Sequence, residues 1–201
     1  QLRELYTRLE FRALLRQLDG DATPAAGAAS AATGATAAAR PAAANPAPLP
    51  APVHGPPVAR HYTTILTEAQ FADWLQRLEA AQLTAFDTET TSLDYLQARI
   101  VGVSFCIEPG HAAYLPLAHN YAGAPDQLDR DQCLARLKPW LQDASKAKLG
   151  HHLKYDAHVL ANHGIALAGL RHDSLLESYV LNSVATRHDM DSLAKLYLDV
   201  D

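Results

Sequence analysis

The chain has 201 residues, a formal net charge of −5 and an isoelectric point near 6.0. This length suits one domain with appendages, and the acidic balance argues against a protein that binds nucleic acid by charge alone, because such binders are usually basic. No apolar run approaches the ~18 residues that a membrane span needs, and no signal-peptide pattern occurs, so we expect a cytoplasmic protein with no membrane partner.

Three zones of different composition follow one another along the chain. Residues 1–20 place apolar side chains at helical spacing, which predicts the helical end of a preceding region. Residues 21–60 hold 8 of the 12 prolines and 17 alanines, which predicts a flexible linker. Residues 61–201 have the pattern of a globular domain. Because the chain begins at Gln1 and stops without a polar tail, we expect a piece of a longer protein.

The globular zone predicts strands and helices in an order typical of a mixed α/β sheet. Strands are expected at 62–66, 83–86, 100–107, 112–117 and 148–150. Helices are expected from Thr67, from Asp129, around Leu153, over about 174–181 and from Asp189. Pro139 is expected to kink or end the second of these helices, because proline removes a backbone donor.

Asp87 and Glu89 stand two residues apart, directly after the apolar strand that ends at Phe86. Side chains alternate along a strand, so both carboxylates leave one face and Thr88 leaves the other. Two like charges on one face repel each other unless a cation or a proton lies between them. Mg²⁺ accepts such carboxylates and keeps positions for water and phosphate, which is what two-metal phosphodiester hydrolysis requires. The spacing alone is weak, because acid-x-acid occurs five times in the chain.

Asp156 is the second candidate metal ligand, at the end of the segment LKYD over residues 153–156. An aspartate in this context is more often an acid on a helix surface. It becomes a candidate because two-metal sites gather their carboxylates from separate elements of the fold.

Four ordered segments together resemble one known family. The segment FDTETTSL (86–93) resembles the first exonuclease motif of the proofreading domain of bacterial DNA polymerase I (family A), and GHHLKYD (150–156) resembles the second. LESYVLN (176–182) and RHDMDSL (187–193) are similar to stretches characteristic of that polymerase family. The resemblance runs from about His61 to Asp201. It implies an RNase H-like mixed sheet flanked by helices, the DEDD exonuclease fold, truncated at the C-terminus.

The resemblance implies 3′→5′ removal of nucleotides from a single-stranded DNA 3′ end with two divalent ions, Mg²⁺ or Mn²⁺. Asp87 and Glu89 would hold the ion that carries the attacking hydroxide, which Glu89 orients. Asp156 would help to hold the second ion, which stabilises the leaving 3′ oxygen. The resemblance also implies a monomer, cytoplasmic and associated with the nucleoid.

Four further residues would contact the substrate by match to the motifs: Thr88, Leu93, His152 and Tyr155. Leu93 matches a residue that wedges against the terminal base, although a core leucine would look the same in sequence. His152 stands where the second motif commonly has asparagine, so its charge would follow pH.

The third motif of the family, Tyr-x-x-x-Asp, supplies a fourth carboxylate and a tyrosine that positions water. After Asp156 only Tyr197 and Asp201 have this spacing, and they follow the 187–193 stretch too closely. We therefore expect the chain to lack this motif and to be nearly inactive as cut. Two alternatives remain: an RNase D-like exoribonuclease, and a non-catalytic exonuclease-like domain that braces the polymerase.

Overall fold

The computed structural model describes residues 59–184 and 187–200. The helix expected over 1–20 lies outside the described residues, as does nearly all of the linker expected over 21–60. The strands are β1 (His61–Thr64), β2 (Leu83–Thr90), β3 (Ile100–Glu108), β4 (His111–Pro116), β5 (Ala147–Gly150) and β6 (Leu170–Asp173). The helices are α3 (Glu68–Ala80), α4 (Arg130–Gln142), α5 (Leu153–Ala161), α6 (Ser174–Asn182) and α7 (Met190–Leu198).

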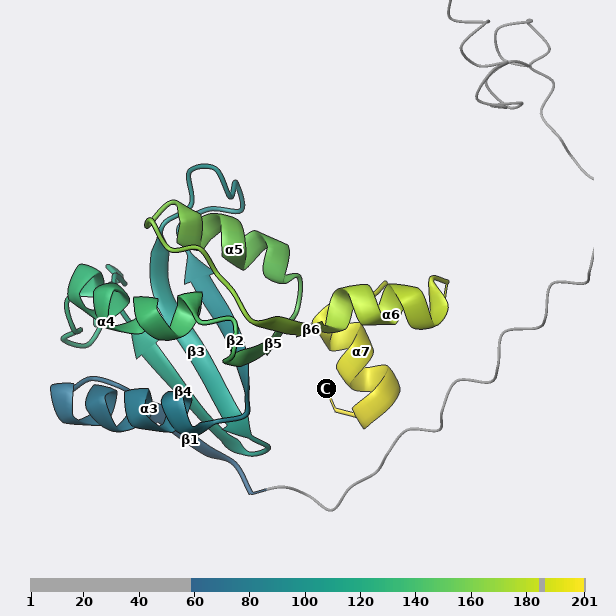
Figure 1. Cartoon of the computed structure of the whole chain (residues 1–201), viewed down its shortest axis with the longest axis horizontal. Coiled ribbons are helices and arrows are strands. Elements are labelled where there is room, and N and C mark those ends of the chain that lie inside the picture. Colours follow the sequence, from purple (N-terminus) through teal and green to yellow (C-terminus); the bar gives the residue numbers. More distant parts are fainter. Residues whose placement is uncertain (1–58, 185–186, 201) are drawn as a thin grey trace, which may run out of the picture. The chain divides into compact units, whose positions relative to one another are not determined.

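The six described strands form one mixed sheet in the order β1-β4-β3-β2-β5-β6 (Figure 1). β3 runs antiparallel to both of its neighbours, β2 and β4. β1 pairs with β4 in parallel, and β5 pairs in parallel with β2 and β6. This mixed sheet with flanking helices confirms the expected α/β, RNase H-like class. β2, which carries the predicted carboxylates, lies inside the sheet between an antiparallel and a parallel neighbour.

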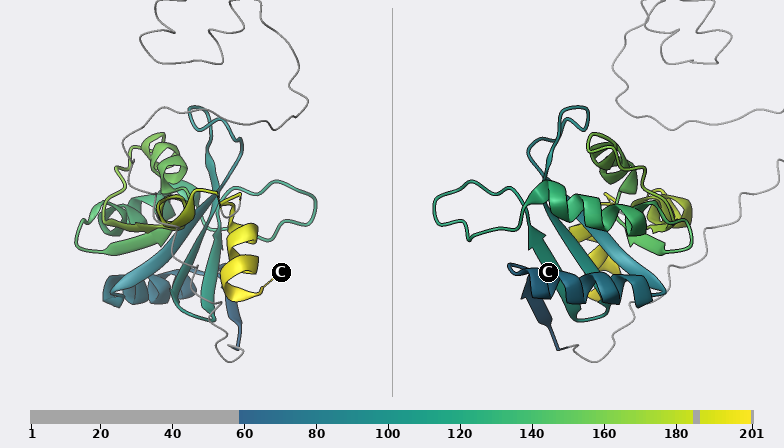
Figure 2. Two further views of the ribbon diagram at one scale, coloured as in Figure 1. Left: turned by 90° about the vertical axis from the view of Figure 1, so that its right-hand side faces the viewer. Right: turned by 60° about the vertical axis from the view of Figure 1, so that its left-hand side comes forward.

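One face of the sheet is covered by helices. Thr84, Phe86 and Thr88 of β2 are buried on this face, and α3, α4 and α5 contribute the buried apolar side chains that share the same core. The rings of Phe86, Phe105 and Trp140 have their centroids 6.0–6.1 Å apart. In the right-hand view of Figure 2, α3 and α4 lie in front of the strands and α7 lies behind them.

The other face of the sheet is less covered and is hollowed. Ala85 and Asp87 of β2 and Ser104 of β3 line a pocket on this face, together with Met190 from α7. Because β2 is buried on one side and faces this pocket on the other, its odd-numbered side chains are the ones that solvent or a ligand can reach.

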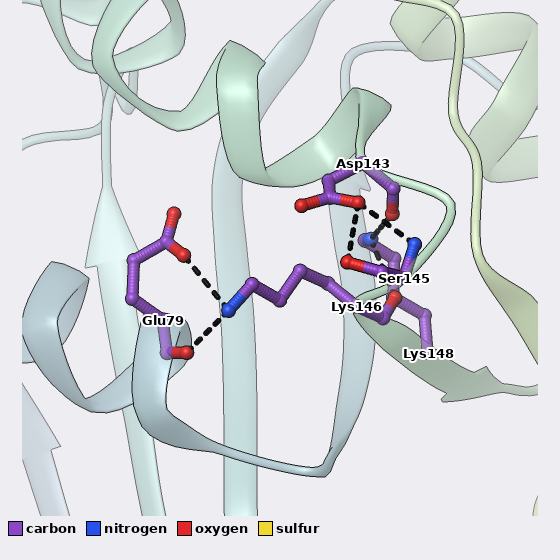
Figure 3. Close-up of polar contacts among 5 residues, drawn as sticks. All are labelled: Glu79, Asp143, Ser145, Lys146 and Lys148. Carbon is purple, nitrogen blue, oxygen red and sulfur yellow. Dashed lines mark hydrogen bonds and ion pairs between the residues drawn. The ribbon is translucent and has the colours of Figure 1, made fainter.

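A polar joint fixes the start of β5 against α3 and α4 (Figure 3). The Lys146 ammonium lies 3.0 Å from the Glu79 carboxylate and also donates to the Glu79 carbonyl. The fully buried Lys148 donates to the carbonyl oxygens of Lys146 at 2.9 Å and of Asp143 at 3.3 Å. Burial lowers the pKa of Lys148 to about 8. These contacts hold β5 in position to pair with β2.

The structure departs from the sequence-based elements at three places. Of the expected kink or end at Pro139, the end is wrong: α4 continues past Pro139 to Gln142, and the buried Trp140 and Leu141 hold its last turn. β6 was not predicted, because LRHD carries no apolar run and is mostly exposed. β2 runs on through the carboxylates to Thr90. Within the described ranges, no helix combines the length and apolar character needed to cross a membrane.

Candidate active site

Asp87 and Glu89 leave β2 on the less covered face, as the strand alternation predicted. Asp87 is half-buried and Glu89 is exposed, whereas Thr88 between them is 7% exposed. Their partners across the antiparallel pair with β3 are Ser104 and Gly102. The pair of carboxylates therefore lies on a regular strand whose position is fixed by the sheet.

Asp156 reaches β2 where β5 has ended. β5 pairs with β2 only from Leu83 to Ala85, and the chain then turns away into α5. Asp156, in the first turn of α5, occupies the space that a longer β5 would fill. Its Oδ1 accepts hydrogen bonds from the Thr88 amide at 3.1 Å and from Thr88 Oγ1 at 2.6 Å. This is the carboxyl end of a parallel strand, where α/β folds commonly bind ligands.

Burial and like charge act together on these acids. Burial, then the charges of Asp156 and Glu89, raise the pKa of Asp87 to about 6, against a hydrogen bond from the Thr88 backbone that lowers it. Burial also raises the pKa of Asp156, which is 2% exposed, and the two donors of Thr88 oppose this rise. A proton or a cation at this place would relieve the repulsion.

The donor set fits a hard divalent cation in its chemistry, because all three side chains offer carboxylate oxygens. Across residues 59–184 and 187–200, no three acidic, histidine or cysteine side chains are grouped closely enough to form a ready-made metal site. Asp87, Glu89 and Asp156 would thus have to converge further to hold an ion.

The turn into α5 depends on the Asp173 carboxylate, which no sequence motif singled out. His152 adopts a left-handed conformation, with φ at 64°, and its amide donates to Asp173 Oδ1 at 3.1 Å. The Leu153 amide donates to Asp173 Oδ2 at 2.9 Å, and Asp173 Oδ1 also caps the first turn of α6. One carboxylate therefore fixes the start of both helices. Its sequence signal is an aspartate directly before the SLLES helix start.

Tyr155 anchors the loop that follows β2. Its hydroxyl lies 2.6 Å from Thr90 Oγ1 and donates to the Ser92 carbonyl. Leu93, next in the chain, is 93% exposed, so it is not a core leucine. Tyr155 therefore holds Leu93 out in solvent, close in sequence to the two carboxylates of β2.

Tyr197 lies on α7, in the described part of the chain. It lines an apolar pocket between α6 and α7 with Leu181 and Leu193. Asp201, which shares the Tyr-x-x-x-Asp spacing with it, lies outside the described residues.

The comparison with protein families identifies the family of this chain. Residues 62–201 match the family described as 3′–5′ exonuclease. The chain belongs to the 3′–5′ exonuclease family. It is 60% identical over 139 residues to DNA polymerase I of Pseudomonas aeruginosa and 38% identical over 154 residues to DNA polymerase I of Rhizobium leguminosarum. Each match covers 68% of this chain and 15% of the relative, so the chain spans about a seventh of their length.

Solved structures show the same fold at low sequence identity. The POL domain of Pol1 from M. smegmatis, in complex with DNA primer-template and dNTP, superimposes with a TM-score of 0.56 at 22% identity, over 69% of this chain and 23% of that one. Escherichia coli RNase D, an exoribonuclease, gives a TM-score of 0.51 at 20% identity, over 70% of this chain and 34% of that one. These likenesses support the fold of the exonuclease domain and leave the choice of substrate open.

The raised pKa of Asp87 predicts that this exonuclease domain is destabilised by its own site. The folded state holds a proton on Asp87 up to about pH 6, whereas the unfolded chain releases it near pH 4. Stability of the metal-free protein should therefore fall as pH rises through this window and stay lower above it. At pH 7.5 with EDTA, Asp87→Asn should raise the free energy of unfolding by about 1–2 kcal/mol.

Chemical denaturation at pH 4.5 and at pH 7.5 measures this effect. The matched control is Asp126→Asn, a change of the same charge at an exposed position. A gain at pH 7.5 that the control shares would mean that net charge, and not the site, is responsible.

Proposed function

We propose that this domain removes nucleotides from the 3′ end of single-stranded DNA, as the proofreading part of a DNA polymerase I that acts in replication and repair. The observation that carries the proposal is the hydrogen bonding of Asp156 to the strand that bears Asp87 and Glu89, which brings its charge close enough to raise the pKa of Asp87. The names of the matched relatives support the same function.

Asp87, Glu89 and Asp156 would hold two divalent ions, Mg²⁺ or Mn²⁺. When bound, such ions activate water as a nucleophile and stabilise the charge on the leaving oxygen. Glu89, exposed at the pocket side of β2, accepts a hydrogen bond from the attacking water and orients it. Asp87, whose pKa is raised by the charges of the two other carboxylates, would supply part of the charge that retains the cations. Thr88 fixes the Asp156 carboxylate beside β2 through two hydrogen bonds.

The substrate contacts extend from this centre in the proposal. Leu93, held in solvent by Tyr155, packs against the terminal base. His152, whose backbone is fixed by Asp173, lies near enough to Asp156 for its positive form to favour the Asp156 carboxylate. We propose that it donates a hydrogen bond to a phosphate of the substrate. The protein acts as a monomer in the cytoplasm, at the nucleoid.

We also propose that the 201-residue chain is nearly inactive alone, because the resemblance to the family implies a fourth carboxylate and a tyrosine that positions water, in addition to the three carboxylates named above. The support is the position of Tyr197, which lines an apolar pocket between α6 and α7. A version extended beyond Asp201 to include a further Tyr-x-x-x-Asp should be the active form.

The test follows a 5′-labelled single strand of DNA through time with Mg²⁺ present. The extended version should give a ladder of products shortened one nucleotide at a time from the 3′ end, and EDTA should stop it. Faster degradation of a structured RNA would favour the RNase D-like alternative. DNA binding without hydrolysis by the extended version would favour the non-catalytic alternative.

A further inference from the structure

Three aromatic rings form a continuous row from β4 into the loop that follows it. The centroids of Tyr114 and His119 are 5.8 Å apart, and those of His119 and Tyr121 are 5.6 Å apart. Tyr114 Oη and His119 Nε2 lie 2.5 Å from each other. We call these three side chains the aromatic row. None of them was singled out by the sequence motifs.

The inner end of the aromatic row lies beside the carboxylates. Tyr114 packs across Gly102, where a Cβ atom would stand 1.9 Å from the tyrosine hydroxyl, and Gly102 is the strand partner of Glu89. Burial, then the negative charge of Glu89, raise the pKa of Tyr114 to about 12. The outer end is open, because Tyr121 is 59% exposed. The row thus leads from Glu89 to solvent.

The loop that carries the outer rings is held in shape by hydrogen bonds. Gln127 accepts from the His119 amide and donates to the His119 carbonyl, both at 2.8 Å. The Ala124 amide donates to the Tyr121 carbonyl at 3.0 Å, which closes a turn. The loop projects from the sheet between β4 and α4 in both views of Figure 2. The rings are therefore set in place before any ligand binds, which lowers the entropy cost of binding.

Charge does not explain what this surface would bind. The loop over 117–129 contains no lysine or arginine, and it carries Asp126 and Asp129. A ligand recognised here must gain its affinity from its rings and not from its phosphates. Unpaired nucleobases fit this requirement, because each has a π-face that stacks on aromatic side chains whatever its sequence.

We infer that the aromatic row is a stacking track for the unpaired bases on the 5′ side of the nucleotide being removed. This inference rests on the proposed function, since the track has a purpose only if the 3′ end lies at Asp87 and Glu89. Tyr121 supplies the outer stacking face. Tyr114 and His119 position it relative to the carboxylates.

The inference predicts which residue contacts DNA. Oligo-dT carrying 5-iodouracil at successive positions is irradiated with the full 201-residue chain in Ca²⁺, and the cross-linked peptide is identified by mass spectrometry. Cross-links from internal positions should fall on Tyr121. In parallel, Tyr121→Ala should weaken binding of dT12 about tenfold, while Tyr121→Phe, which keeps the ring, should bind as the wild type does.

Two further binding measurements separate this inference from the proposed function. The salt dependence of dT12 binding should be the same for Tyr121→Ala and the wild type, because no phosphate contact is removed. Binding of a dinucleotide, too short to reach the outer ring, should also be unchanged. Equal dT12 affinity in the wild type and Tyr121→Ala, in a protein whose extended version degrades DNA, would overturn the track and leave the function standing. If the extended wild type neither degrades nor binds single strands, the proposed function itself fails.

Discussion

Replacement of Asp87 by alanine is expected to reduce Mg²⁺-dependent 3′→5′ hydrolysis by about 10³- to 10⁴-fold, because members of a catalytic constellation act as a unit. The charges of Asp156 and Glu89 both raise the pKa of Asp87. Its loss would therefore remove a carboxylate next to both others, where negative charge would retain the cations. The rate is measured on 5′-labelled single-stranded DNA, in the version extended beyond Asp201. Mn²⁺ binding should weaken in the same variant.

The fold should survive this substitution and become more stable, because like-charge repulsion is removed from a half-buried position. Activity and metal-free stability should therefore move in opposite directions, which a merely structural aspartate would not show. Asp73→Ala serves as the control, since Asp73 is also acidic but exposed on α3, where it pairs with Arg77. A wild-type rate in Asp87→Ala would remove Asp87 from the catalytic set. Loss of the cooperative unfolding transition would instead assign it to the fold.

The sequence predicted those parts of the fold that follow from local periodicity. The apolar run of β3, its turn to β4 and the capped start of α3 at Thr67 all depend on neighbouring residues, and all are present. β6 could not be predicted from the sequence, because it is held by pairing with β5 and not by its own apolar side chains. The continuation of α4 beyond Pro139 could not be predicted for a similar reason, since buried contacts with distant strands stabilise its last turn.

In the candidate site, too, the local features could be predicted from the sequence and the long-range contacts could not. The alternation of Asp87 and Glu89 on one face is a property of any strand, so it could be read from their spacing. The contact between Thr88 and Asp156 spans 68 residues and arises because β5 ends early, which no local pattern reports. The double cap by Asp173 likewise depends on two helix starts coming together. Long-range geometry, and not residue type, was the missing information.

Net charge also has to be reconciled with the proposed nucleic-acid substrate. The chain carries a net charge of −5, so its attraction for a phosphate backbone is weak without cations. Divalent ions at the three carboxylates would supply local positive charge where the scissile phosphate lies. Aromatic stacking at the loop over 117–129 would supply affinity that does not depend on charge. In the proposed function, these features together would let a domain of net negative charge hold a DNA end for cleavage.

Removal of the Thr88 hydroxyl is the second change with a large expected effect. Thr88→Val keeps the shape and the β-branched side chain that suits a strand, but it removes the 2.6 Å hydrogen bond to the buried Asp156 carboxylate. A hydrogen bond to a charged group is worth about 1.5–3 kcal/mol, so we expect the free energy of unfolding at pH 7.5 to fall by about 2 kcal/mol. Chemical denaturation measures this loss.

The same substitution should change catalysis through Asp156 and not through the substrate. With one donor fewer, the pKa of Asp156 should rise above its already raised value, because hydrogen bonds to a carboxylate favour its charged form. The acid limb of the pH–rate profile should therefore move to higher pH, and more Mg²⁺ should be needed for half-maximal rate. Thr88→Ser keeps the donor and loses only a methyl group, worth about 1 kcal/mol. It should retain the wild-type pH profile and Mg²⁺ requirement, and a shift as large as that of Thr88→Val would show that packing, not the hydroxyl, positions Asp156.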